Sequence, residues 1–477
     1  MKTEYDLLII GGGSAGLTAA DFAVRLGLKV ALLEKSRPGG DCTWTGCVPS
    51  KTLLRIARTA HEVRMAPQSG ISAGPPKVDF PAVMSKVREV MEEVAGAESA
   101  EALRSQGIDV FRGEARFLDP HTIATADAEL TARRILIATG AGPLIPPIPG
   151  LDQVGYLTYE TIWGLEVLPE HLLVVGGGPI GCELAQAFRR LGSRVSLVEA
   201  TSRILLQDEP VASALILEEL AKEGVEFHLD APVEKVEIIE KNGQNASVIQ
   251  LTTSQGTVSG DALLLAVGRR ARLSGLELER AGVDYGPTGI EVSQNLRTSQ
   301  RHIYAAGDCL GGFQFTHYAG WQGFMAVRNA LLPGSTRAVL DRVPWTTFTD
   351  PEVAHVGLTE QQARDRYGDQ MEVTNWPMSQ VDRALTDGAS AGFIKLVHRP
   401  NGRLLGATVV SRRAGEMIQE WTLALDQGRK VGDLADSIHV YPTYSMANMQ
   451  VASQLRVAGL LSGASGRIIR KLARLMR

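Results

Sequence analysis

Residues 5–34 read YDLLIIGGGSAGLTAADFAVRLGLKVALLE, and this stretch decides the fold of the first part of the chain. The run Tyr5–Ile10 is mostly apolar, as expected of a central parallel strand. A glycine-rich turn leads into a helical stretch from Leu17 to Leu26, and a second strand, Lys29 to Leu33, ends at Glu34. Such glycines allow a tight turn, the helix N-terminus binds a pyrophosphate and the acid binds a ribose. The residues expected to bind this dinucleotide are Gly11, Gly13, Gly16 and Glu34.

The same pattern occurs a second time further along the chain. A strand from Leu172 to Val175 leads through GGGPIG into a helix that ends at Leu191, and the next strand, Val195 to Val198, ends at an acid. Two such units predict two bound dinucleotides, whereas the alternative is that one of them is a structural turn without a ligand. The residues expected to bind the second dinucleotide are Gly176, Gly178, Gly181 and Glu199.

Between the two units lies GGDCTWTGCVPSK, residues 39–51, which holds two of only four cysteines in the chain. Residues five apart in an ideal helix are separated by about 7.5 Å along its axis, beyond the Cα separation that a disulfide tolerates. Cys42 and Cys47 can therefore pair only if the helix is distorted, and Gly46 can supply that distortion. A helix N-terminus also lowers the pKa of a thiol and favours the reactive thiolate. The alternative is two unrelated buried cysteines, but the pattern favours a redox-active dithiol beside a cofactor.

The composition limits the class of protein. A chain of 477 residues is long enough for about three domains, and 44% hydrophobic residues with 50 glycines fit an α/β protein. The formal net charge of −4 argues against a general nucleic-acid partner. Scarce cysteines indicate a reducing compartment, and the apolar run near the N-terminus is too short for a signal peptide or a membrane span. We therefore expect a cytoplasmic protein.

The rest of the chain completes the predicted domain organisation. A proline-rich crossover from Pro143 to Pro149 marks a boundary, and the composition changes again at about Val343, where strands and helices alternate. The predicted fold class is α/β, with two Rossmann-like dinucleotide-binding domains and a C-terminal α+β domain. The predicted boundaries are 1–150 and 276–340 for the first dinucleotide-binding domain, 151–275 for the second, 341–460 for the α+β domain and 461–477 for a basic amphipathic tail.

Together these motifs resemble the pyridine nucleotide-disulfide oxidoreductases, a family that includes glutathione reductase, dihydrolipoyl dehydrogenase and mercuric reductase. The resemblance extends from about residue 4 to about residue 455. It implies FAD in the first dinucleotide site and NADH or NADPH in the second. It also implies that the last domain forms a homodimer and sends residues to the partner's active site. The motifs that carry it are the two fingerprints, GGDCTWTGCVPSK, Ile137–Gly140, Tyr304–Asp308 and the stretch FTDPEVAHVG at 348–357.

The resemblance assigns roles to the residues around the dithiol. Cys42 would resolve mixed disulfides with the substrate, and Cys47 would make the charge-transfer contact with the flavin. Lys51 is similar to the family's lysine near flavin N5, which pairs with a glutamate at the position of Glu183; the alternative is an ordinary structural ion pair. Electrons from the nicotinamide would reach the disulfide through FAD. The resulting thiolate would attack an acceptor by thiol–disulfide exchange or bind a soft metal ion.

Other positions would bind the cofactors. Asp308 matches the residue at the ribityl-phosphate end of FAD, and Gly140 and Gly268 end the strand phrases that close the two units. Glu199 stands where an acid bonds the 2′-OH of NADH and repels the extra phosphate of NADPH. Arg203 lies near enough in sequence to weaken that preference, so NADH is favoured and NADPH stays open. No resident metal site is expected.

The sequence departs from the family towards its end. Disulfide reductases of this family usually carry His-Pro-Thr-x-x-Glu, but here Tyr441 occupies the histidine position and Met446 the glutamate position. A phenol has a reference pKa of about 10, against about 6.5 for imidazole, so Tyr441 is a poor proton carrier near neutral pH unless its pKa is perturbed. His439 lies two residues away as an alternative acid–base group, although a structural histidine is favoured.

This departure puts glutathione and dihydrolipoamide in doubt as substrates. A tyrosine here is similar to mercuric reductase, yet no cysteine follows Cys309, so that enzyme's C-terminal cysteine pair is missing. Cys182 and Cys309 are expected to be small buried residues. We therefore expect a mercuric reductase-like, FAD-dependent NAD(P)H oxidoreductase that reduces a small-molecule or protein disulfide, or a thiol-bound acceptor. The alternatives are Hg(II) reduction and, in another class, a flavin-binding redox sensor or scaffold.

Residues 463–477, GASGRIIRKLARLMR, combine apolar and basic side chains in an amphipathic pattern. Such a pattern is typical of a helix that lies on an anionic membrane. The alternative, a helix that is solvated or packed in the dimer, is favoured here. The expected location is therefore the cytoplasm, with peripheral membrane association as the second possibility.

Overall fold

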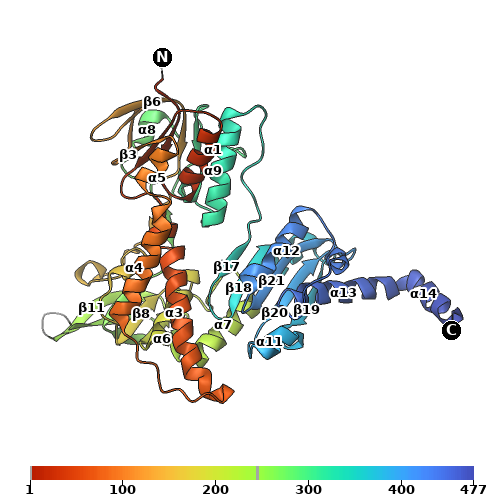
Figure 1. Cartoon of the computed structure of the whole chain (residues 1–477). Helices are drawn as coiled ribbons and strands as arrows, with labels where there is room; N and C mark the ends of the chain where they lie inside the picture. Colours follow the sequence, from red (N-terminus) through yellow and green to blue (C-terminus); the bar gives the residue numbers. More distant parts are fainter. Residues whose placement is uncertain (1–2, 243–245, 477) are drawn as a thin grey trace. The chain divides into compact units, whose positions relative to one another are not determined.

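The computed structural model describes residues 3–242 and 246–476. Contacts divide the chain into two compact units, whose elements are labelled in Figure 1. The first unit contains Met1–Thr201 and Gly224–Leu340, and the second contains Ser202–Glu223 and Asp341–Arg477. Residues 202–223 lie within the predicted second dinucleotide-binding domain in sequence, but by contacts they belong to the second unit.

A seven-stranded sheet forms the base of the first unit. Its strands are β1 (Tyr5–Ile10), β2 (Val30–Glu34), β3 (Ile108–Arg112), β4 (Arg116–Asp119), β5 (Thr122–Ala124), β6 (Glu129–Ile137) and β16 (Ile303–Ala305). The order is β3-β2-β1-β6-β5-β4, with β16 paired to β6. Strands β3, β2, β1, β6 and β16 run parallel, and Leu8 of β1 lies opposite Ala31 and Ile135. This is the parallel sheet that the apolar run in the first fingerprint predicts.

Two helices pack on one face of this sheet. Helix α1 (Ser14–Arg25) buries alanines at i, i+4 spacing, namely Ala15, Ala19 and Ala23. These small side chains share a core with Leu7 and Ile9 of β1 and with helix α9 (Thr316–Leu331), which lies beside α1 in Figure 1. The close packing places the N-termini of both helices near the carboxyl ends of the parallel strands.

The second dinucleotide-binding region has a parallel sheet of its own. Its strands are β8 (His171–Val175), β9 (Arg194–Val198), β10 (Val225–His228) and β14 (Ala262–Leu265), in the order β10-β9-β8-β14. Helix α6 (Pro179–Leu191) follows β8, as the second fingerprint predicts. An antiparallel sheet of β11 (Val233–Asn242), β12 (Ala246–Thr253) and β13 (Gly256–Gly260) shares a core with this sheet. The predicted α/β fold with two Rossmann-like sheets is therefore confirmed.

The remaining elements of the first unit connect these sheets. Strand β7 (Ala141–Pro143) pairs with β15 (Arg269–Ala271), so the proline-rich crossover begins at a strand pair. The helices are α2 (Gly40–Trp44), α3 (Cys47–Met65), α4 (Phe80–Gly96), α5 (Ala100–Ser105) and α8 (Leu278–Ala281). The short 3-10 turns are η1 (Ala66–Ser69), η2 (Leu151–Gln153), η3 (Ile162–Gly164) and η4 (Asp308–Leu310).

The second unit is built on a five-stranded antiparallel sheet, as expected of the α+β domain. Its strands are β17 (Trp345–Thr347), β18 (Glu352–Gly357), β19 (Glu372–Pro377), β20 (Phe393–His398) and β21 (Leu404–Ser411), in the order β17-β18-β21-β20-β19. Its helices are α7 (Pro210–Lys222), α10 (Glu360–Tyr367), α11 (Asp382–Thr386), α12 (Ala414–Asp426), α13 (Met446–Leu461) and α14 (Gly463–Leu475), with 3-10 turns η5 (Met378–Gln380) and η6 (Val431–Asp436).

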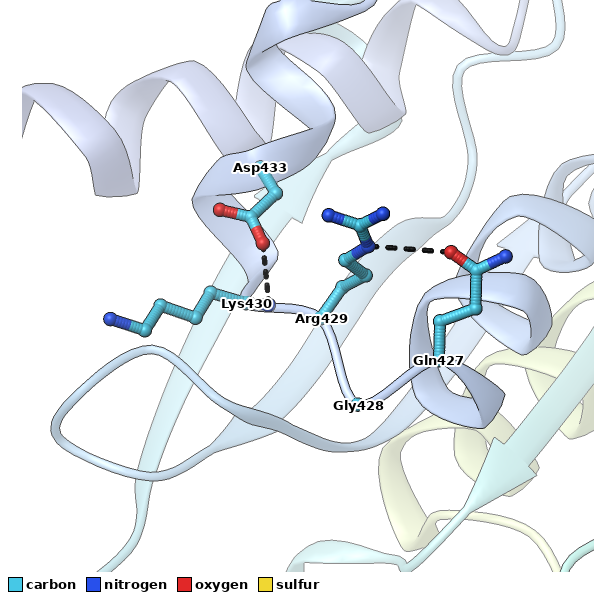
Figure 2. Close-up of a pocket in the computed structure, with 5 residues that line it drawn as sticks. All are labelled: Gln427, Gly428, Arg429, Lys430 and Asp433. Carbon is cyan, nitrogen blue, oxygen red and sulfur yellow. Dashed lines mark hydrogen bonds between the residues drawn. The ribbon is translucent and has the colours of Figure 1, made fainter.

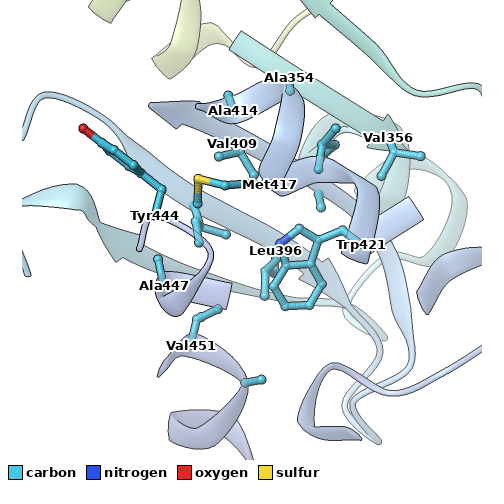
Figure 3. Packing of buried hydrophobic residues seen from close by; sticks show 14 of the residues in the cluster. Ala354, Val356, Leu396, Val409, Ala414, Met417, Trp421, Tyr444, Ala447 and Val451 are labelled. Carbon is cyan, nitrogen blue, oxygen red and sulfur yellow. The ribbon is translucent and has the colours of Figure 1, made fainter. Parts of the chain in front are cut away.

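A tryptophan lies at the centre of the core of this unit. Trp421 of α12 is fully buried against Met417, Leu396 and Val451 (Figure 3). Its indole N–H donates to the Asn448 amide oxygen at 2.8 Å, which satisfies the one polar atom of the ring. The core therefore joins the sheet to both α12 and α13.

A buried ion cluster holds residues 202–223 in the second unit. Lys395 of β20 is 7% exposed, and its Nζ lies 2.8 Å from Glu209 Oε2 and 2.7 Å from Glu360 Oε2. Nearby, the Trp345 indole N–H donates to Asp208 Oδ1 at 2.9 Å. Because Asp208 and Glu209 directly precede α7, the cluster explains why this helix belongs to the second unit by contacts.

Candidate active site

The two cysteines of the dithiol lie on two different helices. Cys42 belongs to α2, and Cys47 is the first residue of α3. The break between them is at Gly46, where a side-chain Cβ would lie 2.9 Å from the Asp41 carbonyl oxygen. The distortion predicted at Gly46 is therefore present. Both thiols are free and partly buried.

The two thiols differ in their protonation. The hydrogen bond from Cys42 lowers the pKa of Cys47 to about 6; burial opposes this shift, whereas Thr316 and the charge of Lys51 support it. The same bond, together with burial, raises the pKa of Cys42. Thr316 Oγ1, at the start of α9, lies 3.4 Å from Cys47 Sγ. At neutral pH, therefore, Cys47 carries the thiolate and Cys42 carries the proton.

Lys51 and Glu183 form an ion pair beside the dithiol. Lys51 lies one turn after Cys47 on α3, and its Nζ is 2.9 Å from Glu183 Oε2 on α6. The Glu183 side chain is 7% exposed, so the pair is shielded on the carboxylate side. The structure thus places a cation one helical turn from the thiolate and connects the dithiol helix to the helix of the second dinucleotide unit.

A network of charged side chains, which sequence analysis missed, surrounds Asp41, the residue before Cys42. The Arg269 guanidinium donates to Asp41 Oδ2 at 2.5 Å and to Asp308 Oδ2 at 2.6 Å. Arg272 donates to Asp41 Oδ1 at 3.1 Å and also pairs with Glu160. The Tyr159 hydroxyl donates to Asp41 Oδ2 at 3.1 Å. Arg269 therefore connects the dithiol helix to Asp308, the residue expected to bind FAD.

No local signal in the sequence could have identified this network. Asp41 and Arg269 are 228 residues apart, and charged residues without a periodic pattern are usually solvated. A partial signal is the position of Arg269 directly after Gly268, which ends the second unit. Burial raises the pKa of Asp308, and the charge of Arg269 opposes that shift. The ion pair with Arg269 therefore favours the ionised form of the largely buried Asp308 carboxyl group.

The first dinucleotide site has a shape and donor set that fit FAD. Gly11 has φ +109, and a side chain there would overlap the Ala138 carbonyl. Glu34 Oε2 accepts from the Gly12 N–H at 2.8 Å. Helix α1 begins after Gly13 without a side-chain cap or an acid in its first turn, so its N–H groups are available for a pyrophosphate. Among the described residues, buried Thr139 Oγ1 has no hydrogen-bond partner, which leaves a polar atom for a ligand beside Gly140.

The second dinucleotide site repeats this geometry and fits a nicotinamide dinucleotide. Gly176 also has φ +109, with Gly181 packed against its carbonyl, and α6 follows Gly178 without a side-chain cap or a first-turn acid. Glu199 Oε2 accepts from the Gly177 N–H at 2.6 Å. Gly268 has no side chain, and its backbone carbonyl accepts a hydrogen bond from the Leu144 N–H at 3.0 Å. The site therefore supplies backbone donors and one ribose-binding acid.

Arg203, expected near the second site, lies in the second unit by contacts. Its guanidinium donates to the backbone carbonyls of Leu205, Leu206 and Asp208. Burial raises the pKa of Asp208, the Trp345 hydrogen bond and the charge of Arg203 oppose the shift, and the resulting pKa is about 6. These bonds hold the loop before α7, and the expected influence of Arg203 on the nicotinamide site stays a prediction.

Tyr441 and His439 lie in the second unit with different surroundings. The Tyr441 side chain is exposed, and its hydroxyl donates to Asp382 Oδ2 at 2.8 Å, which raises its pKa. His439 Nε2 lies 2.8 Å from Glu420 Oε2, and Nδ1 lies 2.9 Å from the Ser437 carbonyl. Burial would lower the pKa of His439, but its bonds to Glu420 and Ser437 raise it overall. Both ring nitrogens thus have hydrogen-bond partners, and the structural role expected for His439 stays a prediction.

Three further observations complete the description of candidate sites. Cys182 and Cys309 are fully buried, as predicted. Within 3–242 and 246–476, no group of three or more His, Cys, Asp or Glu side chains could hold a metal ion. In the same residues, no helix is long and apolar enough to cross a membrane.

A pocket in the second unit lies outside the redox chemistry. Figure 2 shows it at the turn after α12, lined by Gln427, Gly428, Arg429, Lys430 and Asp433. Its side chains bond within the turn, since Arg429 Nε donates to Gln427 Oε1 at 3.3 Å and the Lys430 N–H donates to Asp433 Oδ2 at 3.0 Å. With no thiol and no apolar lining residue, this pocket is a poor candidate for the active site.

Comparison with known families gives two matches. Residues 5–323 match the family described as pyridine nucleotide-disulphide oxidoreductase, and residues 343–451 match the dimerisation domain of that family. Among curated relatives, a mercuric reductase of Bacillus cereus is 36% identical over 92% of this chain and 70% of its own length. A dihydrolipoyl dehydrogenase of Thermus scotoductus is 37% identical over 95% of this chain and 98% of its own length.

Solved structures agree with these matches. The HOCl-induced flavoprotein disulfide reductase RclA from Escherichia coli has a TM-score of 0.84 and 31% identity, over 94% of this chain and 99% of that chain. LpdA from Mycobacterium tuberculosis has a TM-score of 0.84 and 30% identity, over 94% and 99% of the two chains. A Cu(II) complex of RclA has the same TM-score.

Proposed function

Because the chain belongs to the pyridine nucleotide-disulphide oxidoreductase family, we propose that Cys42 and Cys47 deliver electrons to a disulfide or a thiol-bound acceptor. The family is FAD- and NAD(P)H-dependent, and the chain is a mercuric reductase-like flavoprotein disulfide reductase. Bound FAD supplies two-electron transfer between the nicotinamide and the dithiol. We propose the acceptor, the preferred nicotinamide and the roles of single residues.

The observation that carries the proposal is the difference in protonation between the two thiols. In the reduced pair, the Cys42 sulfur attacks one sulfur of the acceptor disulfide, and the other sulfur leaves as a thiol with the proton that Cys42 gives up. Cys47 then attacks the Cys42 sulfur, releases the second thiolate and restores the Cys42–Cys47 disulfide. In this proposal Cys42 forms the mixed disulfide and Cys47 resolves it, whereas the resemblance gave the resolving role to Cys42. Because the pKa of Cys47 is lowered to about 6, this second attack starts from a group that is already ionised.

Other residues of this chain have positioning roles in the proposal. Lys51, held by Glu183, keeps a positive charge near the thiolate of Cys47. Thr316 donates a hydrogen bond to the same sulfur when it is ionised. Arg269 holds Asp41 and Asp308 in place, so that α2 keeps its position relative to the FAD-binding residue.

We assign NADH as the favoured nicotinamide on the basis of Glu199. Its carboxylate accepts from Gly177 N–H and from the N–H and hydroxyl of Thr201, which fix it at the end of β9. A fixed negative charge there repels the 2′-phosphate of NADPH. The nearby Arg203 is bonded to backbone carbonyls of its own loop.

A homodimer with Tyr441 at the acceptor site is part of the same proposal. Residues 343–451 match the family's dimerisation domain. The residues around Tyr441 are exposed and apolar, with Ile438 at 99% and Val440 at 76% exposure, which suits a surface covered by a second copy. The small number of cysteines, four in the chain, agrees with a reducing cytoplasm.

Hg(II) reduction is the second candidate function. The curated relatives named mercuric reductase support it, and a soft metal ion prefers thiolate ligands of the kind that Cys47 offers. A redox sensor or scaffold is the alternative from another class, in which turnover would be incidental.

An acceptor panel on the purified holoenzyme distinguishes these functions. Low-molecular-weight disulfides, Hg(II) with excess thiol, and quinones are each supplied with NADH, and the Cys42→Ser variant serves as the control. We expect one disulfide or thiol-bound acceptor to be reduced much faster than oxygen, and only by the wild type. Equal rates in the variant would overturn the dithiol mechanism, and slow oxidation of NADH with every acceptor would indicate a sensor.

A further inference from the structure

Helix α14 separates apolar and cationic side chains onto opposite faces. At 3.6 residues per turn, the apolar residues Ile468, Ile469, Leu472, Leu475 and Met476 occupy an arc of about 120°. The cationic residues Arg467, Arg470, Lys471 and Arg474 occupy an arc of about 100° on the other side. We call these the apolar arc and the cationic arc. The two arcs do not overlap, and α14 carries no Asp or Glu that would reduce its positive charge.

The apolar arc is outside the core of the second unit. Leu475 is 73% exposed and Met476 is 89% exposed, and the other three residues of the arc are exposed as well. Helix α13 is buried only through its first half, as far as Ala452, and α14 continues beyond its end in Figure 1. An exposed apolar arc of this size can be removed from water only by contact with a partner.

The charge around the cationic arc has one sign. Residues 437–477 contain no Asp or Glu, although the chain as a whole has a net charge of −4. Among the described residues, none of the four cations of the arc forms an ion pair, and Arg470 donates to the Leu461 carbonyl at 3.0 Å. The arc therefore offers its positive charge to an anionic partner.

We propose that α14 binds the surface of an anionic lipid bilayer. The apolar arc would lie at the boundary between headgroups and acyl chains, and the cationic arc would contact the anionic headgroups. The helix has 13 residues, fewer than the roughly 20 that a span requires, so it lies on the bilayer. Binding of this kind is independent of the acceptor that the dithiol reduces.

Two other occupants match the surface less well. A nucleic acid would neutralise the cationic arc but would leave the apolar arc in water. A second copy of α14 would cover the apolar arc but would bring cationic side chains together with no acid from 437–477 to balance them. A bilayer with anionic lipids offers both chemistries in one plane.

Vesicle sedimentation with the full-length holoenzyme tests the proposal. Vesicles of phosphatidylcholine, with or without phosphatidylglycerol, are spun with the wild type, with the triple variant I468S/L472S/L475S, and with the quadruple variant R467E/R470E/K471E/R474E. We expect wild-type binding only to anionic vesicles, reduced by high salt. Each variant should lower the partition coefficient by about 10²-fold or more, given the free-energy contribution of each cation or buried aliphatic chain.

Matched controls separate α14 from general surface effects. Val167→Ser removes an apolar side chain that is 76% exposed elsewhere, and Arg88→Glu reverses an exposed cation on α4. Both should bind vesicles like the wild type. The proposal is overturned if the wild type fails to bind anionic vesicles. It is also overturned if the triple variant binds normally, because binding would then depend on charge alone and not on the apolar arc. A triple variant with a lower molar mass by light scattering would also overturn it and identify a second copy as the occupant.

Discussion

At the scale of single residues, the environment of Cys47 decides which sulfur is ionised. The Cys42 thiol and the Thr316 hydroxyl both point hydrogen-bond donors at Cys47, and Lys51 adds positive charge. Burial works against ionisation, so the low pKa depends on these donors being held in place. Asp41, one residue before Cys42, is in turn held by two arginines and a tyrosine.

The first prediction concerns the donor at position 42. Cys42→Ala removes the largest cause of the shift, so the pKa of Cys47 should rise above about 6, whereas Cys42→Ser retains a hydroxyl donor and should raise it less. The pH dependence of Cys47 alkylation by iodoacetamide, followed by peptide mass spectrometry, measures the midpoint. In each protein the reactive thiolate of Cys47 becomes protonated as the pH falls through that midpoint, so alkylation slows. Identical midpoints in Ala, Ser and wild-type proteins would show that the donor is elsewhere.

The second prediction concerns Asp41. Asp41→Asn keeps the size of the side chain but removes the charge that Arg269 and Arg272 bind, and a charge-assisted hydrogen bond contributes about 1.5–3 kcal/mol. The free energy of unfolding of the first unit should fall by that order. Glu160→Gln, which affects Arg272 alone, serves as the control and should cost less. A larger cost for the control would mean that Arg272, rather than Asp41, is the centre of the network.

At the scale of elements, helix termini and strand ends position the chemistry. Helices α1 and α6 begin directly after glycine turns without side-chain caps, which keeps their N–H groups for phosphates. Strands β2 and β9 end at Glu34 and Val198, so the acids Glu34 and Glu199 lie at equivalent places in the two sheets. The same construction therefore serves both dinucleotides.

The third prediction tests the acid after β9. Glu199→Arg should raise kcat/KM for NADPH relative to NADH by about tenfold or more, the equivalent of about 1.4 kcal/mol, because it replaces repulsion of the 2′-phosphate with attraction. Glu199→Gln removes the charge but can still accept from Gly177 N–H, and it should give an intermediate ratio. Steady-state rates with both nucleotides provide the measurement. A wild type that already prefers NADPH would contradict the assignment.

The fourth prediction tests how α7 is held in the second unit. Lys395→Met leaves the buried Glu209 without its cation, and breaking a buried pair costs about 3–5 kcal/mol. Urea denaturation followed by near-ultraviolet circular dichroism should show this loss in the transition of the second unit. Lys222→Met, which removes an exposed lysine paired with Glu218 and Glu219, should leave the transition almost unchanged. Equal effects of the two substitutions would exclude a special role for the buried cluster.

At the scale of the whole molecule, the dithiol and Tyr441 belong to different compact units. In the proposed homodimer, the dimerisation domain at 343–451 supplies Tyr441 to the acceptor site. The Tyr441 hydroxyl donates its one hydrogen to Asp382 and is protonated, so it can donate to an acceptor only after that hydrogen bond is exchanged.

The fifth prediction separates the two half-reactions. Tyr441→Phe should slow reduction of the acceptor by about 10²-fold or more, the usual effect of losing a positioned acid–base group. Reduction of the enzyme by NADH, measured by stopped flow, should stay normal, because that step does not use the acceptor site. His439→Gln is the matched control and should leave both steps unchanged if His439 is structural. A Tyr441→Phe protein that is slow in both steps would remove Tyr441 from the acceptor site.

The sequence alone determined the features that depend on neighbours along the chain. Both fingerprints, their strands and helices, and the break at Gly46 follow from patterns a few residues long, because backbone geometry and periodicity are local. Only the tertiary structure decided which distant side chains meet. Thr316 reaches Cys47 across 269 residues, Arg269 reaches Asp41 across 228, and Lys395 reaches Glu209 across 186. A polar or charged side chain has no sequence period that marks its partner. These pairs therefore form only when packing brings the elements together and excludes water from around them.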